Sequence, residues 1–173
     1  MSAEAWEFVY GPQCDFLDPS VVAAFTDSLK DRSFILWVGL CCKTWSIARK
    51  DDGGPRPLRD EGMNLWGFEN LEGEDRERVR KSNVLTRLTL TIMEHVLSFG
   101  MPLILENPQS SRLWLIPKLR ALVEKFNDEF VHVDYCQYGT KWKKPTALLV
   151  FNLAGLNEAL KRCSPKNLSL IHI

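Results

Sequence analysis

The chain has 173 residues, of which 45% are hydrophobic and 25% charged, and its 22 basic side chains balance 22 acidic ones. This length suits one compact domain and is short for two. The formal net charge of zero excludes binding to a polyanion through overall charge, so any contact with nucleic acid has to come from local patches.

The sequence carries no sign of export or membrane insertion. No apolar run reaches the roughly 18 residues that a membrane span requires, and the segment MSAEAWEFVYG has neither the basic nor the apolar region of a signal peptide. We therefore expect an intracellular protein, in the cytoplasm or nucleus, with reduced thiols and no membrane partner. The cysteines show no Cys-x-x-Cys spacing, so we expect no metal site. They are Cys14, Cys41, Cys42, Cys136 and Cys163.

The first predicted elements are a helix and a buried strand. Asp18 and Pro19 are typical of the first positions of a helix, which we expect to continue to about Leu29. The short and continuous apolar run over 33–40 predicts a buried strand. A loop rich in glycine and proline follows over 41–75, and loops of this length are uncommon unless they are functional or disordered.

The second half of the chain alternates between further helices and strands. A long amphipathic helix is predicted over 76–99 and should end at Gly100. Its apolar stripe consists of Val84, Leu88, Ile92 and Val96, broadened by Leu85, Met93 and Leu97. The remaining elements are a strand over 101–108, a helical stretch over 111–126 with a break near Pro117, strands over 130–139 and 146–153, and a last helix over 155–163. This order predicts an α/β domain with a largely parallel sheet.

Two pairs of chemically active side chains stand where predicted strands end. Cys41 and Cys42 follow the first strand, and Glu106 and Asn107 close the second. In open α/β sheets, ligands bind just beyond the carboxyl ends of the strands. We therefore expect the two pairs to contribute to one site.

The segment GLCCKTWS resembles the catalytic-cysteine motif of the cytosine-C5 methyltransferases. The pattern of that family is Gly-x-Pro-Cys-x-x-Phe-Ser, followed by a glycine-rich loop. Gly39, Cys42 and Ser46 match its glycine, cysteine and serine. Cys41 stands at the position of the proline, and Trp45 at that of the phenylalanine.

Two later segments are similar to the same family. LILENP matches a strand that ends in a Glu-Asn pair, with proline where the family usually has valine. VDYCQYGTKWKKPTALLVF matches, through Tyr138 and Gly139, a block in which Tyr-Gly precedes an arginine-containing segment. Lysines replace the arginines here, and a lysine lacks the planar fork of a guanidinium group. They are Lys141, Lys143 and Lys144.

The resemblance implies a partial Rossmann-like sheet of a methyltransferase dependent on S-adenosylmethionine, mostly parallel and with helices on both faces. It implies methylation of cytosine at C5 in DNA. The thiolate of Cys42 would add to C6, so that C5 becomes nucleophilic toward the methyl group of S-adenosylmethionine. Glu106, with Asn107 beside it, would stabilise the charge on the ring. Because the target base has to leave the stack, the loop after Cys42 would close over it.

The resemblance also implies binding residues. Those expected to contact nucleic acid are Ser46, Arg49, Lys143 and Lys144. Those expected to contact the cofactor are Asp15, at the adenine edge, and Gly39.

The segments that bind the cofactor in this family are not recognisable in the sequence. Nothing before Cys14 supplies the glycine-rich turn that holds the methionine part of the cofactor. We therefore predict that 1–155 form a partial catalytic domain, and that 156–173 are a C-terminal tail that reads like non-native sequence. The expected partners are DNA and an N-terminal segment or second chain that completes the cofactor site. The isolated chain should be inactive.

Other interpretations stay open. A cysteine at the end of a strand is often only a small buried hydrophobe. The chain could be an inactive methyltransferase-like module that binds nucleic acid or has a structural role in a mobile-element protein, or a different thiol-dependent enzyme. DNA and RNA are both open as the polymer. The basic loop residues either contact phosphate or are simply solvated: Arg49, Lys50, Arg56 and Arg59.

Overall fold

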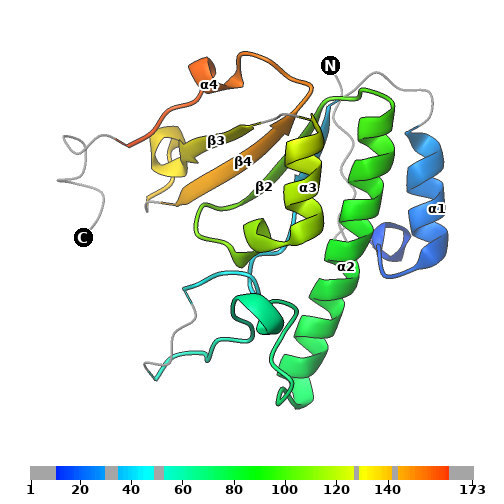
Figure 1. Ribbon diagram of the computed structural model, residues 1–173, viewed down its shortest axis with the longest axis vertical. Helices are drawn as coiled ribbons and strands as arrows, with labels where there is room; N and C mark the ends of the chain where they lie inside the picture. The colour runs from blue at the N-terminus through cyan, green and yellow to red at the C-terminus, as the bar shows by residue number, and fades with distance from the viewer. Residues whose placement is uncertain (1–10, 30–34, 49–52, 127–128, 142–143, 164–173) are drawn as a thin grey trace.

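The computed structural model describes residues 11–29, 35–48, 53–126, 129–141 and 144–163 (Figure 1). The strands are β1 (Leu36–Gly39), β2 (Leu103–Pro108), β3 (Glu129–Asp134) and β4 (Pro145–Phe151). The α-helices are α1 (Pro19–Ser28), α2 (Gly73–Ser98), α3 (Pro117–Phe126) and the single turn α4 (Leu156–Ala159). Short 3₁₀ helices are η2 (Pro12–Cys14), η3 (Gly62–Asn64), η4 (Arg112–Leu115) and η5 (Tyr135–Tyr138). None of the helices in these ranges combines the length and the apolar character needed to cross a membrane.

The four strands form one open mixed sheet in the order β1-β2-β4-β3. β1 and β2 are parallel, and β4 runs antiparallel to both β2 and β3. The predicted α/β class is confirmed, whereas the sheet is mixed rather than mostly parallel. The connection between β3 and β4 explains the difference. A parallel crossover needs a dozen or more residues and usually a helix, whereas the segment 135–144 is shorter than that, and its described residues form one 3₁₀ turn.

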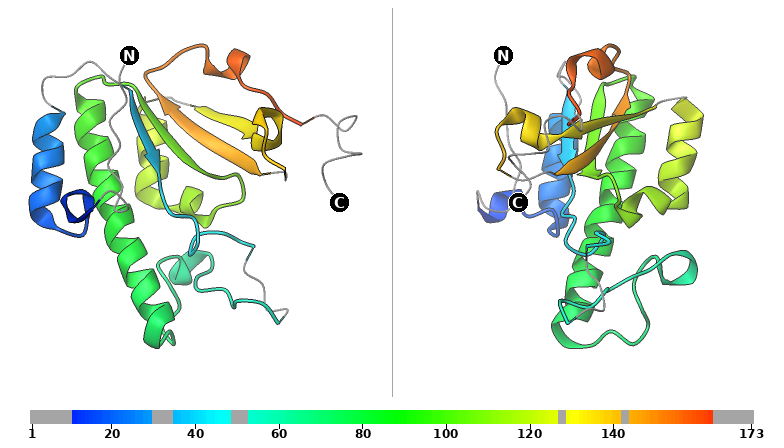
Figure 2. Two further views of the ribbon diagram at one scale, coloured as in Figure 1. Left: turned by 180° about the vertical axis from the view of Figure 1, so that it is seen from behind. Right: turned by 90° about the vertical axis from the view of Figure 1, so that its left-hand side faces the viewer.

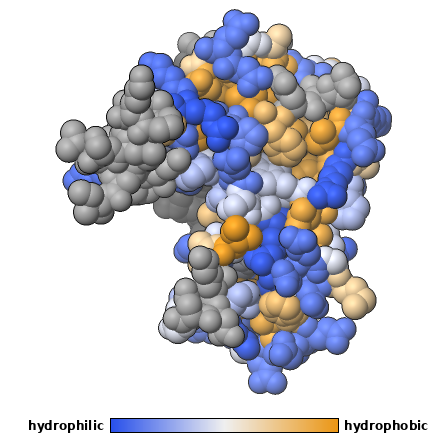
Figure 3. Space-filling view, turned by 60° about the vertical axis from the view of Figure 1, so that its left-hand side comes forward, coloured by the Kyte–Doolittle hydropathy of each residue, from blue (hydrophilic) through white to orange (hydrophobic). Residues whose placement is uncertain are grey.

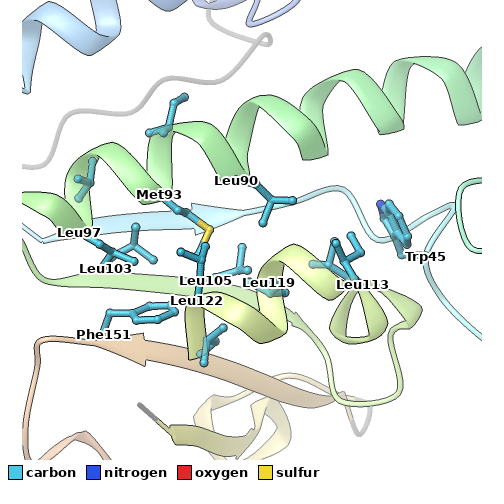
Figure 4. Packing of buried hydrophobic residues seen from close by; sticks show 14 of the residues in the cluster. Trp45, Leu90, Met93, Leu97, Leu103, Leu105, Leu113, Leu119, Leu122 and Phe151 are labelled. Carbon is cyan, nitrogen blue, oxygen red and sulfur yellow. The ribbon is translucent and has the colours of Figure 1, made fainter. Parts of the chain in front are cut away.

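The two faces of the sheet are covered unequally. Leu103, Leu105 and Phe151 on one face pack against α2 and α3 (Figure 4). On the other face Ile104 and Val131 belong to a smaller cluster, which α4 and its flanking residues cover. The long helices α2 and α3 therefore lie on the first face, and among the described residues the second face is covered by the short elements α4 and η5 and the residues beside them.

The local start signals of the helices are confirmed. The Asp18 carboxylate accepts a hydrogen bond from the backbone N–H of Ser20 and caps α1, whose first residue is Pro19. The predicted break near Pro117 is also present, because η4 ends at Leu115 and α3 begins at this proline. α2 begins at Gly73, slightly before the predicted start, and ends at Ser98.

The buried stripe of α2 agrees with the predicted one in the second half of the helix and differs from it in the first half. Ile92, Met93, Val96 and Leu97 are buried as predicted, and Leu90 is buried as well (Figure 4). Val84 was also expected on the core face, but it is 41% exposed. Apolar residues surround more than one side of this helix, so a period of 3.6 residues alone does not select the face that packs.

Residues 53–72, called the loop lobe below, extend past the end of the sheet along the first half of α2 (Figures 1 and 2). Leu58 and Leu71 of the lobe pack on Val79 of α2 and form a small core separate from the sheet. Figure 3 shows a broad upper part and a narrower lower part, with hydrophobic and hydrophilic side chains interspersed on both. The lobe is thus an ordered structure at one end of the sheet.

Part of the predicted C-terminal tail packs against the domain. The backbone N–H of Asp134 donates to the Lys161 carbonyl at 3.2 Å, and its carboxylate accepts from the N–H of Cys163 at 2.8 Å. The Tyr138 hydroxyl accepts from the N–H of Lys161 at 2.8 Å. Residues 156–163 therefore belong to the folded body, and residues 164–173 lie outside the described ranges. The non-native origin of the tail stays a prediction.

Met93→Ala should lower the free energy of unfolding by about 3 kcal/mol, because it removes a fully buried side chain between α2 and the sheet and leaves a cavity. Urea denaturation followed by circular dichroism measures this change. Thr91→Ala on the exposed side of the same helix is the matched control and should stay within about 0.5 kcal/mol of the unmodified chain. Equal losses in both variants would contradict the assigned face of α2.

Candidate functional site

The register of β1 and β2 brings two predicted site residues together. Gly39, the last residue of β1, is the direct partner of Glu106 on β2. A Cβ atom placed on Gly39 would lie 3.8 Å from Oε2 of Glu106. The bare glycine therefore leaves space beside the carboxylate, whose side chain is 14% exposed. The Glu106 side chain is therefore partly accessible to solvent.

A third segment of chain supplies a cation to this carboxylate. Nζ of Lys144, just before β4, lies 3.2 Å from Oε1 of Glu106. The same Nζ lies 4.8 Å from the centre of the Tyr135 ring. Burial raises the pKa of the Tyr135 phenol, and the negative charge of Glu106 raises it further. These three side chains form one electrostatically coupled group, called the Glu106 group below.

Asn107 joins β2 to the segment that carries the cysteines. Its side chain is fully buried, and Nδ2 donates a hydrogen bond of 2.9 Å to the Leu40 carbonyl. Leu40 directly precedes Cys41 and Cys42. Asn107 therefore holds the chain as it leaves β1. Its predicted catalytic role stays a prediction, and its observed contact is structural.

The two cysteines differ in exposure, since Cys42 is half-buried and Cys41 is exposed. The Cys42 carbonyl accepts hydrogen bonds from the N–H groups of Trp45 at 3.0 Å and Ser46 at 2.8 Å. Residues 42–46 thus form a closed turn, called the Cys42 turn below. The Cys42 side chain is not fully enclosed in the hydrophobic core. Cys42 follows Gly39, the residue that pairs with Glu106, by three positions in the chain.

The other predicted binding residues are placed less closely. The Ser46 hydroxyl accepts a hydrogen bond from the Ala48 N–H, and the Asp15 carboxylate accepts one from the Leu17 N–H. Within the described residues, no hydrogen bond or ion pair joins Asp15 to the Glu106 group. Arg49 and Lys143 lie outside the described residues, so their roles stay predictions.

Arg59 differs most from what the sequence suggests. It stands among charged loop residues, for which the alternatives were phosphate contact and simple solvation, yet it is 0% exposed. Its guanidinium Cζ lies 3.5 Å from the centre of the Trp45 ring. Its contacts come from neutral groups that are scattered along the chain, so no local sequence signal marks it. Arg56 in the same loop is exposed.

Other features of the described residues lie apart from this site. A groove between η4, α3 and β3 is lined by Trp114, Leu119, Val123 and Phe130, among others, and holds none of the predicted site residues. In the ranges that the structure covers, no three His, Cys, Asp or Glu side chains are grouped so that they could hold a metal ion.

Comparison of the chain with models of protein families, with curated proteins and with solved structures finds no match.

Proposed function

We propose that the protein is the catalytic part of a cytosine-C5 methyltransferase acting on DNA, with Cys42 as nucleophile and Glu106 as the carboxyl group that contacts the base. The single observation that supports this most is the pairing of Gly39 with Glu106, which brings the segment leading to Cys42 and the carboxylate to the same end of the sheet. The coarser finding, an α/β domain with a four-stranded mixed sheet, is compatible with a partial Rossmann-like methyltransferase.

The chemistry assigns one step to each of these residues. The Cys42 thiolate forms a bond to C6 of cytosine, and the electron pair of the C5–C6 double bond moves into the ring toward N3. Glu106 donates a proton to N3 as this charge develops and takes it back when the C5–C6 double bond forms again, while its other oxygen accepts a hydrogen bond from the exocyclic amine. S-adenosylmethionine, when bound, supplies the methyl group that C5 takes up. Loss of the C5 proton then restores the double bond and expels the Cys42 thiolate, which is a good leaving group.

Lys144 fits the position at which the family places a cation. Its ammonium group lies on Glu106 and beside the Tyr135 ring. A lysine presents a point charge and not a planar fork. We infer that Lys144 orients the Glu106 carboxylate and adds positive charge where the cytosine ring becomes negative. This role is favoured over the predicted contact of Lys144 with a phosphate of the nucleic acid.

The described residues do not by themselves fit the cofactor. Gly39 leaves open space, but the Asp15 carboxylate is engaged with Leu17, and the described residues ahead of Asp15 form no glycine-rich turn. The methyl donor would therefore be held mainly by another segment or by a partner chain.

The free edge of β1 suggests where that partner binds. β1 stands at one end of the strand order, so its outer edge has no strand partner among the described residues. Ile35 and Trp37 are 49% and 53% exposed on the same side of this strand. An unpaired strand with exposed apolar side chains favours the addition of another strand. We propose that the cofactor-binding polypeptide pairs here.

Trapping with 5-fluorocytosine tests the function. The full chain, complemented with the cofactor-binding segment of a methyltransferase of this family, is incubated with S-adenosylmethionine and DNA in which fluorine replaces hydrogen at C5. After methyl transfer C5 carries no proton, so the thiol cannot be expelled and a covalent adduct should survive denaturing electrophoresis. DNA with ordinary cytosine is the control and should give turnover without an adduct. Binding of the fluorinated DNA without any adduct would instead favour the inactive nucleic-acid-binding module.

A further inference from the structure

The Cys42 turn is anchored on both sides of the cysteines. On the β1 side, Asn107 donates to the carbonyl of Leu40 at 2.9 Å. On the other side, Arg59 contacts the turn through the side chains of Thr44 and Trp45. The backbone between these two anchors is short and contains Cys41 and Cys42. The position of the thiol therefore depends on both anchors.

Arg59 connects three parts of the fold that are distant in sequence. Its Nη2 donates to Oγ1 of Thr44 at 3.0 Å, in the Cys42 turn. Its Nη1 donates to the Leu65 carbonyl at 3.0 Å, in the loop lobe, and to Oδ1 of Asn83 at 3.1 Å, on α2. One buried side chain thus attaches the turn to the lobe and to the longest helix.

The Trp45 ring is held between aromatic and cationic neighbours. The Arg59 guanidinium lies over one face of this fully buried ring, and Trp66 contacts it edge-on, with 5.8 Å between the ring centres. The guanidinium group of Arg87 lies over the Trp66 ring, with its Cζ 4.5 Å from the ring centre. Because the Trp45 side chain is fully buried and packed on two sides, it anchors its own backbone, whose N–H donates to the Cys42 carbonyl.

A lysine or an apolar residue could not make this set of contacts. The planar guanidinium stacks on the ring while its two terminal nitrogens reach acceptors in different directions. All the hydrogen-bond acceptors of Arg59 are neutral, and a buried cation without a carboxylate is expensive to maintain. Burial, together with the nearby charge of Arg112, lowers the pKa of Arg59 to about 10, so the group remains charged at neutral pH.

We propose that Arg59 is a positioning residue that holds the Cys42 turn, and with it the thiol, in place at the carboxyl end of β1. The expectation that Arg59 affects catalysis rests on the proposed function. The positioning itself concerns only this chain and can be measured without DNA or cofactor, so failure of one idea can be told from failure of the other.

The experiment measures the alkylation of Cys42 by iodoacetamide in the full chain, with Cys41→Ser as the background so that one reactive thiol remains in the segment. Peptide mass spectrometry gives the rate for Cys42 and, in the same sample, for the buried Cys136. Arg59→Met should raise the Cys42 rate about tenfold, because the turn opens locally while the sheet stays folded and continues to protect Cys136. Arg59→Lys keeps the charge but not the fork and should give a smaller rise.

Arg87→Met is the matched control. Arg87 also stacks on a tryptophan, but it is exposed and its stacking partner is Trp66 rather than a residue of the Cys42 turn, so the Cys42 rate should change by less than about twofold. An unchanged Cys42 rate in the Arg59 variants would overturn the proposal, as would a rise that Cys136 matches. If Arg59→Met does not fold, Arg59→Lys is judged by the same two criteria. A rise confined to Cys42 with no trapping of fluorinated DNA would support the positioning and contradict the proposed chemistry.

Discussion

Cys42→Ser is expected to abolish the covalent adduct with 5-fluorocytosine DNA, with a loss in rate on the order of 10⁴ or more, as for the removal of other catalytic nucleophiles. A serine hydroxyl is almost fully protonated at neutral pH and is a much weaker nucleophile than a thiolate. It has nearly the shape of cysteine, and Cys42 is only half-buried, so the fold should persist. The measurement is the fraction of DNA that remains attached to protein on a denaturing gel.

Cys41→Ser is the matched control for this prediction. Cys41 is the neighbouring residue in the same segment and is exposed, so the two variants differ only in which thiol is lost. Trapping should continue in Cys41→Ser at close to the rate of the unmodified chain. Trapping that survives in Cys42→Ser and disappears in Cys41→Ser would assign the nucleophile to Cys41 instead.

Glu106→Gln is expected to slow adduct formation by a factor of about 10²–10⁴, the range observed when a group that transfers protons or stabilises charge in the transition state is removed. Glutamine keeps the shape of the side chain but cannot carry the negative charge that pairs with Lys144 at 3.2 Å. The pKa of the Tyr135 phenol should also fall toward its ordinary value, because the charge of Glu106 contributes to its increase. Single-turnover trapping kinetics and ultraviolet titration of tyrosine measure the two effects.

A second ion pair in the chain provides the control for Glu106→Gln. Glu94 on α2 lies 2.7 Å from Nζ of Lys118, and the two side chains are 46% and 45% exposed. Glu94→Gln removes the same charge from a comparable pair away from the site, and surface pairs of this kind contribute about 0–1 kcal/mol. Its trapping rate should be unchanged. Equal rates in the two variants would remove Glu106 from the proposed mechanism.

Features that depend on neighbouring residues in the chain could be predicted from the sequence. The cap of α1 by Asp18 and the break before α3 at Pro117 are confirmed because they arise from the side chain or ring of one residue acting on the adjacent backbone. The expectation that the ends of the first two strands lie together is confirmed by the pairing of Gly39 with Glu106. For that feature only the parallel alignment of the two strands was needed, although β1 is a half-exposed edge strand and not the buried strand that was predicted.

Features that depend on contacts between distant segments could not be predicted in this way. The place of β4 between β2 and β3 depends on pairing between segments far apart in the chain, and the burial of Leu90 rather than Val84 on α2 depends on the elements against which the helix packs. The burial of Arg59 requires acceptors from the Cys42 turn, the loop lobe and α2 at once. The residue types thus decided which groups were chemically able to act, because reactivity is a property of the side chain. Only folding decided which of them are buried, paired or adjacent, because those properties depend on segments that are separated along the chain.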